Sequence, residues 1–363
     1  MRILHILSTP RAEGTPNLVL DWLSTGSHEQ EVFVLNAQPA DLTDQLRSGA
    51  KWYDESNHFS MGPRKFFAIA ASIHRVCVNR KPDLVICWPT GFANWVCLGA
   101  RWAGVKRLLV HCGNPTNRDF KHDWITRYVM WPLQLLGARC ICCSNYVKNS
   151  FLSVPFVPGH LFYTVYNCSR GQAVRARAVA ARQGRSPENK PSGIMVATLE
   201  RHKDHRTLLK AINLVHQMEP TFKIRLVGDG SLRRELETCA AELHLEGVVE
   251  FLGTRRDVPE LLGTSDLFIF STTPQEGLGS VLLEALAAGL PVVASDVPAC
   301  RELLAAGRYG MLVSPGDPAA LAKAIVQALR HPTPTTPEEA MAYANSFTAQ
   351  RMMREYLDLA PAE

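Results

Sequence analysis

Short apolar runs alternate along the whole chain with stretches in which apolar residues recur at helical spacing. Continuous apolar runs of this length are typical of strands buried in a parallel sheet. We expect strands at residues 2–7, 31–35, 82–87, 106–111, 139–143, 162–167, 193–198, 223–228, 248–253, 267–271, 291–295 and 310–313. We expect helices at residues 17–24, 41–49, 63–78, 95–102, 124–137, 145–152, 207–218, 231–243, 258–262, 280–288, 299–304, 319–329 and 347–359. This alternation predicts an α/β protein with parallel sheets.

The length of 363 residues suits two domains rather than one core. Residues 171–192 are basic and alanine-rich and then polar, so we expect them to form a crossover linker, part helix and part loop. Residues 1–7 read as the first strand and are too short for a signal peptide. No stretch approaches the roughly 20 apolar residues of a membrane span.

Composition and charge add two expectations. The ten cysteines are scattered, and the run at 140–143 lacks zinc-ligand spacing, so we expect no metal site and a reducing cytoplasm. Residues 1–168 hold 17 lysines and arginines against 11 acidic residues. A basic half can favour an anionic membrane surface or acceptor, and a solvated surface is an equal alternative. Helix 124–137, with its aromatic stripe, fits either a membrane-docking helix or, the favoured interpretation, a core helix.

The stretch 272–296 carries the chemistry. A polar loop with Gly277 and Gly279 leads into a short apolar helix, and such a helix start suits an anion such as phosphate. Glu276 and Glu284 stand on either side of that anion position, where each can hold hydroxyl groups. Hydroxyl-rich groups flanking a diphosphate describe a nucleotide sugar. The alternative is that both glutamates are merely solvated, although Glu284 lies among apolar residues, where an unpaired charge is costly.

This stretch resembles the signature of the retaining glycosyltransferases of family 4. The residues that carry the resemblance are Glu276-Gly-Leu-Gly, Glu284-Ala after seven intervening residues, and the run Gly-Leu-Pro-Val-Val-Ala-Ser-Asp ending at Asp296. The resemblance implies the GT-B fold, in which two Rossmann-like parallel-sheet domains face each other across a cleft. It implies an acceptor-binding domain at 1–168, joined by a crossing helix within 345–363, and a donor-binding domain at 169–344.

The resemblance also implies roles for particular residues. Lys203, Glu276 and His111 would be the catalytic residues. His111 would orient the donor sugar from the end of its strand. The alternative for His111 is that it is a structural histidine of the core. Lys203 would meet the diphosphate together with Arg201 or Arg206. Further donor-binding positions are the amides of Gly277, Leu278 and Gly279, the Glu284 carboxylate on the ribose, and the base-reading backbone of Gly253, Thr254 and Arg255.

Four positions depart from this pattern or extend it. Gly14 is the single glycine of the first loop, where the family often has a pair near the phosphates and acceptor. Thr198 stands where the family has an arginine. Asn114 and Arg118 follow His111 and could reach the acceptor.

The implied reaction moves a hexose-type sugar from a nucleoside diphosphate sugar, expected to be a UDP-sugar, to an acceptor hydroxyl, with retention and without metal or other cofactor. The acceptor would be a glycan, glycolipid or lipid-linked saccharide in polysaccharide biosynthesis of the cell envelope. We expect no nucleic-acid partner. A GT-B phosphorylase or epimerase and a non-catalytic nucleotide-sugar-binding subunit remain alternatives, the last because of Thr198.

Overall fold

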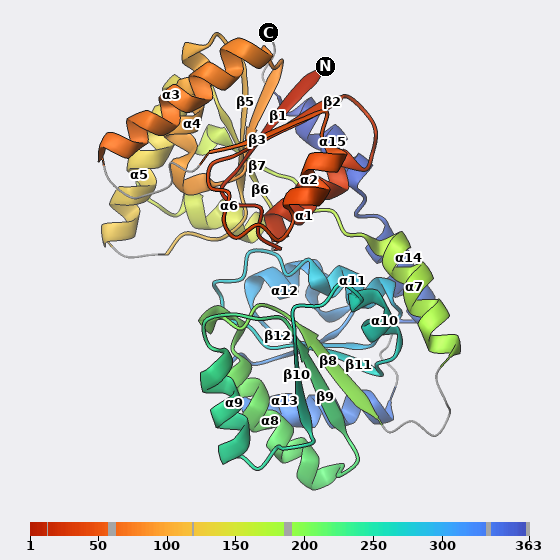
Figure 1. Cartoon of the computed structure of the whole chain (residues 1–363). Helices are drawn as coiled ribbons and strands as arrows, with labels where there is room; N and C mark the ends of the chain where they lie inside the picture. Colours follow the sequence, from red (N-terminus) through yellow and green to blue (C-terminus); the bar gives the residue numbers. More distant parts are fainter. Residues whose placement is uncertain (13, 57–62, 118–119, 185–190, 332–334, 361–363) are drawn as a thin grey trace. The chain divides into compact units, whose positions relative to one another are not determined.

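The computed structural model describes residues 1–12, 14–56, 63–117, 120–184, 191–331 and 335–360 (Figure 1). The chain divides into two compact units. Unit 1 comprises Met1–Cys168 and Ala349–Glu363, and unit 2 comprises Ser169–Thr348. No helix among the described residues is both long and apolar enough to cross a membrane.

Unit 1 contains a seven-stranded parallel sheet in the order β3-β2-β1-β4-β5-β6-β7. Its strands are β1 (Arg2–Leu7), β2 (Glu29–Val34), β3 (Trp52–Glu55), β4 (Leu84–Cys87), β5 (Arg107–Cys112), β6 (Arg139–Cys142) and β7 (Phe162–Thr164). The order of connection reverses between the neighbouring strands β1 and β4. Ligands of open α/β sheets bind outside the carboxyl ends of the strands at such a point.

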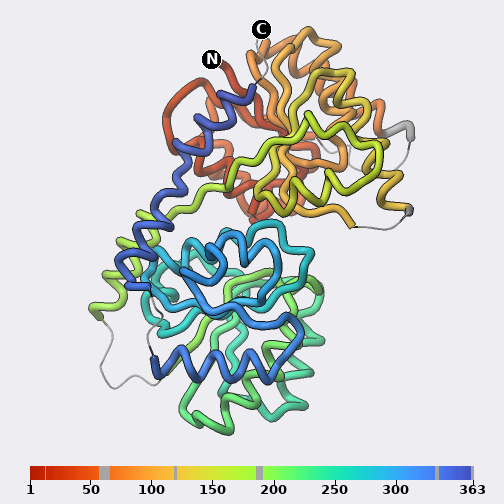
Figure 2. Tube along the Cα trace, turned by 180° about the vertical axis from the view of Figure 1, so that it is seen from behind, coloured from red at the N-terminus to blue at the C-terminus, as the bar shows by residue number. Residues whose placement is uncertain are grey.

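The helices of unit 1 cover both faces of this sheet. They are α1 (Gly14–Leu23), α2 (Thr43–Gly49), α3 (Pro63–Arg80), α4 (Ala93–Trp102), α5 (Phe120–Leu135), α6 (Asn145–Leu152) and α15 (Ala349–Asp358). Helices α3, α4 and α5 lie side by side on one face, and α1, α2 and α15 lie on the other (Figure 1). Figure 2 shows α15, in dark blue, beside the red amino-terminal part of unit 1, where Met352, Met353 and Tyr356 are buried in the core.

Unit 2 contains a six-stranded parallel sheet in the order β10-β9-β8-β11-β12-β13. Its strands are β8 (Ser192–Val196), β9 (Lys223–Val227), β10 (Val249–Gly253), β11 (Leu267–Phe270), β12 (Val292–Ser295) and β13 (Met311–Val313). Its helices are α7 (Gly171–Gln183), α8 (His205–Met218), α9 (Arg233–Glu242), α10 (Val258–Gly263), α11 (Val281–Ala287), α12 (Pro298–Leu303), α13 (Pro318–Arg330) and α14 (Pro337–Asn345). The order reverses between β8 and β11, so both units have the strand order of a Rossmann fold.

The parallel sheets confirm the expected α/β class, but three local predictions need correction. Strand β3 was not predicted, because its sequence Trp-Tyr-Asp-Glu has no apolar run and lies at the edge of the sheet. Helix α14 was also missed; it packs against α7 and α11, so the chain returns to unit 1 at Ala349 rather than at residue 345. The expected linker, part helix and part loop, needs no correction: it begins as α7, which belongs to unit 2, packs against α10 and α11 and buries Val174 and Ala178. Residues 185–190 of that linker lie outside the described residues.

The third correction concerns α5. The favoured interpretation, a core helix with a buried aromatic stripe, is wrong. Helix α5 buries Val129, Met130 and Leu133 instead. Its stripe is exposed, with exposed fractions of 56% for Trp124, 56% for Tyr128, 55% for Trp131 and 87% for Leu135.

Candidate active site

In unit 2, the loops that follow β8 and β11 carry the predicted residues to the point where the strand order reverses. After β8 the chain runs through Thr198 into a single 3-10 turn, η3 (Arg201–Lys203), and then into α8. Asp204 between them has a left-handed φ of 41°, and its side chain accepts a hydrogen bond from the Thr207 amide, 3.4 Å away. This N-cap fixes where η3 ends and therefore where Lys203 lies.

Hydrogen bonds join the two loops directly. The Thr272 hydroxyl and the Thr273 amide both donate to the His202 carbonyl oxygen, each at 2.9 Å. The Thr272 amide donates to the Ser295 hydroxyl at 3.0 Å, which ties the loop to the end of β12. Sequence reasoning missed His202 and Thr272. The bonds end on a backbone carbonyl oxygen of His202, so no pair of side chains in the sequence signals them.

Lys203 and Glu276 form an ion pair where these loops meet. The Lys203 ammonium bonds Glu276 Oε2, and the side chains are only 15% and 9% exposed. The ammonium also lies 5.1 Å from the centre of the Phe270 ring, and the Gly277 amide donates to Glu276 Oε1 at 3.2 Å. Burial alone would raise the pKa of Glu276, but the charge and hydrogen bond of Lys203 outweigh it and hold the pKa below its usual value. The carboxylate is therefore ionised at neutral pH.

The loop beyond Glu276 leads into α11. Gly277, Leu278 and Gly279 are buried, and Gly279 has a φ of +76°, a conformation that favours glycine. A Cβ at Gly279 would lie 3.2 Å from the Phe270 ring, so a larger residue would crowd it. Glu284 is half-buried on α11, with buried Leu283 and Ala285 beside it.

The predicted arginines are less confined. Arg201 is exposed, and Arg206 is exposed and pairs with Glu235 on α9 at 2.7 Å. Thr198 is half-buried, and its carbonyl oxygen accepts from the Glu200 amide at 2.8 Å. Neither arginine is brought into the Lys203–Glu276 pair.

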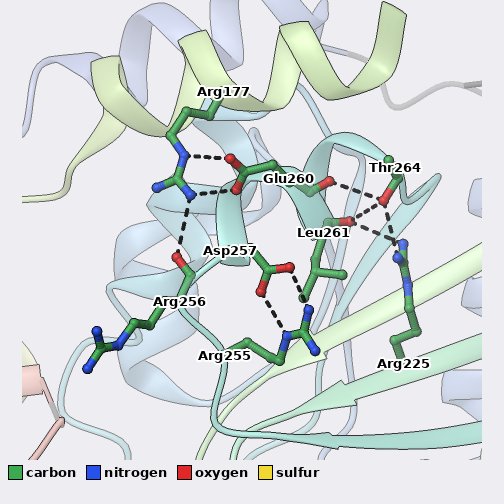
Figure 3. A network of polar contacts seen from close by, with 8 residues as sticks. All are labelled: Arg177, Arg225, Arg255, Arg256, Asp257, Glu260, Leu261 and Thr264. Atoms are coloured by element: carbon green, nitrogen blue, oxygen red, sulfur yellow. Dashed lines mark hydrogen bonds and ion pairs between the residues drawn. The ribbon is translucent and has the colours of Figure 1, made fainter. Parts of the chain in front are cut away.

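The predicted base-reading segment lies at the edge of the sheet, two strands from β8. Gly253 ends β10 with a φ of +65°, and its carbonyl oxygen accepts from the Gly228 amide at 2.9 Å. Thr254 and Arg255 are exposed, and Arg255 pairs with Asp257 at 2.6 Å (Figure 3). In the same network, Arg177 of α7 donates to both carboxylate oxygens of Glu260, which joins α7 to α10 within unit 2 (Figure 3).

In unit 1, a cavity of about 430 Å³ lies at the carboxyl ends of β1, β4 and β5, where that sheet reverses its order. Its polar lining includes Ser8, Thr90, His111, Asn114 and Thr116. Its apolar lining comes from the loops and from α5 and α6, and includes Trp88, Pro115, Ile125, Val129, Met130 and Phe151. Gly14 begins α1 one residue before Thr15, which lines the cavity. Arg118 lies outside the described residues.

His111 is held in the wall of this cavity by α15. Its side chain is buried, and its Nδ1 is hydrogen bonded to the Tyr356 hydroxyl at 2.7 Å. The Trp88 ring packs against it with ring centres 5.0 Å apart. A Cβ added at Gly113 would lie 3.1 Å from Nε2, so the absence of a side chain there leaves room beside this atom. Burial lowers the pKa of His111 to about 4, so the imidazole is neutral at physiological pH.

Comparison with known proteins identifies the second unit. Residues 177–346 match the family described as glycosyl transferases group 1. Unit 2 is a glycosyl transferases group 1 domain. The chain is 31% identical over 142 residues to the lipopolysaccharide core biosynthesis glycosyltransferase LpsE of Rhizobium meliloti, a match covering 39% of this chain and 40% of LpsE. It is 34% identical over 168 residues to the phosphatidyl-myo-inositol mannosyltransferase of Mycobacterium leprae, covering 43% of each protein.

The fold matches over the whole chain. The structure of Anabaena HepE in complex with UDP and glucose superposes with a TM-score of 0.85 at 20% identity, covering 99% of each chain. WaaG, a glycosyltransferase of lipopolysaccharide biosynthesis, gives a TM-score of 0.69 at 15% identity. These similarities confirm the GT-B fold around the group 1 domain. They leave the roles of individual residues as predictions.

Proposed function

We propose that the chain is a retaining, metal-independent glycosyltransferase that moves a hexose-type sugar from a UDP-sugar to an acceptor hydroxyl. The observation that carries the proposal is the buried Lys203–Glu276 pair, which lies beside the Gly277–Gly279 loop where β8 and β11 diverge. The group 1 match and the relatives named for glycosyl transfer in lipopolysaccharide and lipid synthesis support it. The acceptor would be a glycan, a glycolipid or a lipid-linked saccharide.

The donor half of the reaction needs positive charge on the departing diphosphate. Lys203 would supply it, with help from Arg201 or Arg206 and from the amides of the Gly277–Gly279 loop. A bound diphosphate would compete with Glu276 for Lys203, and this would release the carboxylate to hold the donor sugar. Glu284 would accept hydrogen bonds from the ribose hydroxyls.

The acceptor half of the reaction would use the unit 1 cavity. His111 is neutral and would orient the donor sugar from the wall of this cavity, as a hydrogen-bonding group rather than as a cation. In the reaction, the bond from the anomeric carbon to the diphosphate oxygen breaks and a bond to the acceptor oxygen forms on the same face. The acceptor proton passes to the departing phosphate.

The test combines calorimetry with product analysis. Wild-type protein is expected to bind UDP, Glu284→Ala to weaken that binding, and Lys203→Ala to lower turnover. Lys210→Ala is the matched control, because Lys210 is exposed on the same helix that follows Lys203. Transfer that persists with a chelator, and an NMR spectrum showing retained anomeric configuration, would support the proposed mechanism.

The alternatives give different products. A phosphorylase would require inorganic phosphate, and an epimerase would convert the nucleotide sugar without any acceptor. Donor binding without transfer to a panel of acceptors would point to a non-catalytic subunit. The absence of binding to uridine, guanosine and adenosine diphosphates would refute the proposal as a whole.

A further inference from the structure

Unit 1 carries an exposed apolar surface that the proposed reaction does not use. The aromatic face of α5 consists of Trp124, Tyr128, Trp131, Leu135 and the adjacent Phe156. The first four recur at helical spacing and form one stripe, and Phe156 is 80% exposed. Residues 124–135 span about 16 Å of helix at a rise of 1.5 Å per residue. An exposed aromatic stripe of this length marks an interaction surface.

Specific contacts hold this face in place. The Arg127 guanidinium lies 5.4 Å from the centre of the Trp124 ring and 5.6 Å from that of Phe156, and so lies close to both rings. Arg127 Nε donates to the Pro155 carbonyl oxygen at 2.8 Å, and Trp131 Nε1 donates to the Phe156 carbonyl oxygen at 2.8 Å. These bonds attach the loop after α6 to α5. These contacts hold Trp124, Trp131 and Phe156 close together on the surface.

The part of unit 1 that carries this face is rich in basic residues. Residues 57–168 contain thirteen lysines and arginines and only three acidic residues, and residues 124–168 contain no acidic residue at all. Lys121 is exposed on α5 itself, and Arg127 lies close to the rings of Trp124 and Phe156. The one acidic residue on the described part of α5 is Asp123, which is half-buried. Apolar aromatic side chains with a basic surround complement an anionic lipid surface, where Trp and Tyr are favoured at the headgroup level.

We propose that the aromatic face of α5 docks unit 1 onto an anionic lipid bilayer. Trp124, Tyr128 and Leu135 would enter the interface, while Arg127 and Lys121 would contact lipid phosphates. The opposite side of the same helix lines the unit 1 cavity through Val129 and Met130. Docking would therefore hold that cavity next to the lipid surface. The surface itself exists whether or not the chain transfers sugar, so its test is independent of the proposed function.

Vesicle co-sedimentation tests the proposal with the full chain and no donor or acceptor. Vesicles of phosphatidylglycerol and phosphatidylcholine in equal parts are compared with pure phosphatidylcholine. The triple variant Trp124→Ser/Tyr128→Ser/Leu135→Ser removes exposed side chains. It leaves intact the hydrogen bonds that Trp131 and Arg127 donate to the loop after α6. Its matched control is Val179→Ser/Met218→Ser, which removes exposed apolar side chains from unit 2. Circular dichroism verifies that each variant is folded.

Wild type and control are expected to bind the anionic vesicles, and the triple variant to bind at least about tenfold more weakly, because three interfacial side chains are lost. Brominated lipid should quench the tryptophan fluorescence of the wild type, and it should quench the fluorescence of Trp124→Phe to a smaller extent. Failure of wild type to bind anionic vesicles would overturn the proposal, as would equal binding by a folded triple variant. Self-association that the triple variant abolishes, without vesicle binding, would assign the face to a second copy and also overturn it.

Discussion

Replacing Lys203 by methionine would leave the Glu276 carboxylate without its counter-ion in a site where the glutamate side chain is 9% exposed. Methionine has a similar length, so the change removes the charge with little loss of packing. Removing one partner of a buried ion pair costs about 3–5 kcal/mol. We expect the lower end, about 3 kcal/mol, because the Gly277 amide still donates to the carboxylate.

The loss should depend on pH in a defined direction. In the wild type the pKa of Glu276 is lowered, so its contribution to stability is present above the unfolded-state pKa and is lost as pH falls through the folded-state value. In the variant, burial is no longer opposed by Lys203, and the pKa of Glu276 should rise. Protonation then relieves the unpaired charge. The difference in unfolding free energy between wild type and variant should therefore shrink as pH falls from about 7 toward about 5.

Urea unfolding can assign this loss to unit 2. All seven tryptophans belong to unit 1: residues 22, 52, 88, 95, 102, 124 and 131. Tryptophan fluorescence therefore reports unit 1, and the far-ultraviolet circular dichroism reports both units. The unfolding transition of Lys203→Met, measured by circular dichroism, should move to lower urea concentration. The double variant Lys203→Met/Glu276→Gln should recover part of the lost unfolding free energy. A loss below about 1 kcal/mol that does not change with pH would refute the reasoning, because it is what an exposed ion pair would give.

Three other measurements probe the remaining structure. Tyr356→Phe leaves His111 Nδ1 without its hydrogen-bond partner in the core, so the unfolding free energy of unit 1 should fall by about 1–3 kcal/mol. Tryptophan fluorescence during urea unfolding measures this loss, and an unchanged midpoint would show that the bond contributes nothing. Burial lowers the pKa values of His5, His111 and His205 from 6.5 to about 4, so the unfolded chain binds more protons between those values. Stability should fall as pH drops through this window, and a flat profile of urea midpoints would contradict the burial of neutral histidines. Gly228→Ala would place a Cβ against the backbone carbonyl just after β8 at a φ of +137°, so a loss of about 3 kcal/mol or more is expected by circular dichroism; a near-neutral effect would show that the backbone there can move.

The fold was largely predictable because buried parallel strands leave continuous apolar runs. This signal failed at β3, a half-exposed edge strand with two carboxylates in four residues. It also misjudged α5, because helical spacing of aromatic residues shows that they share a face but not whether that face is buried. Which side of α5 faces the sheet depends on Val129 and Leu133, and only the packed structure decides between the two stripes.

The candidate site was predictable in its residues but not in its contacts. The Gly-rich loop and its glutamates marked the carboxyl end of β11, and the resemblance pointed to Lys203 after β8. Their pairing depends on hydrogen bonds from Thr272 and Thr273 to a backbone carbonyl, which leave no sequence pattern. The bond from His111 to Tyr356 joins residues 245 positions apart, beyond any local signal.

The position of α15 in unit 1 has a consequence for synthesis on the ribosome. Residues 349–358 emerge after every residue of unit 2, yet they carry the Tyr356 ring that packs against Trp22 in the core of unit 1. The core of unit 1 therefore stays partly exposed to solvent while unit 2 is being translated. Unit 1 can therefore complete its packing only after all of unit 2 has been made, although its first 168 residues are translated before unit 2.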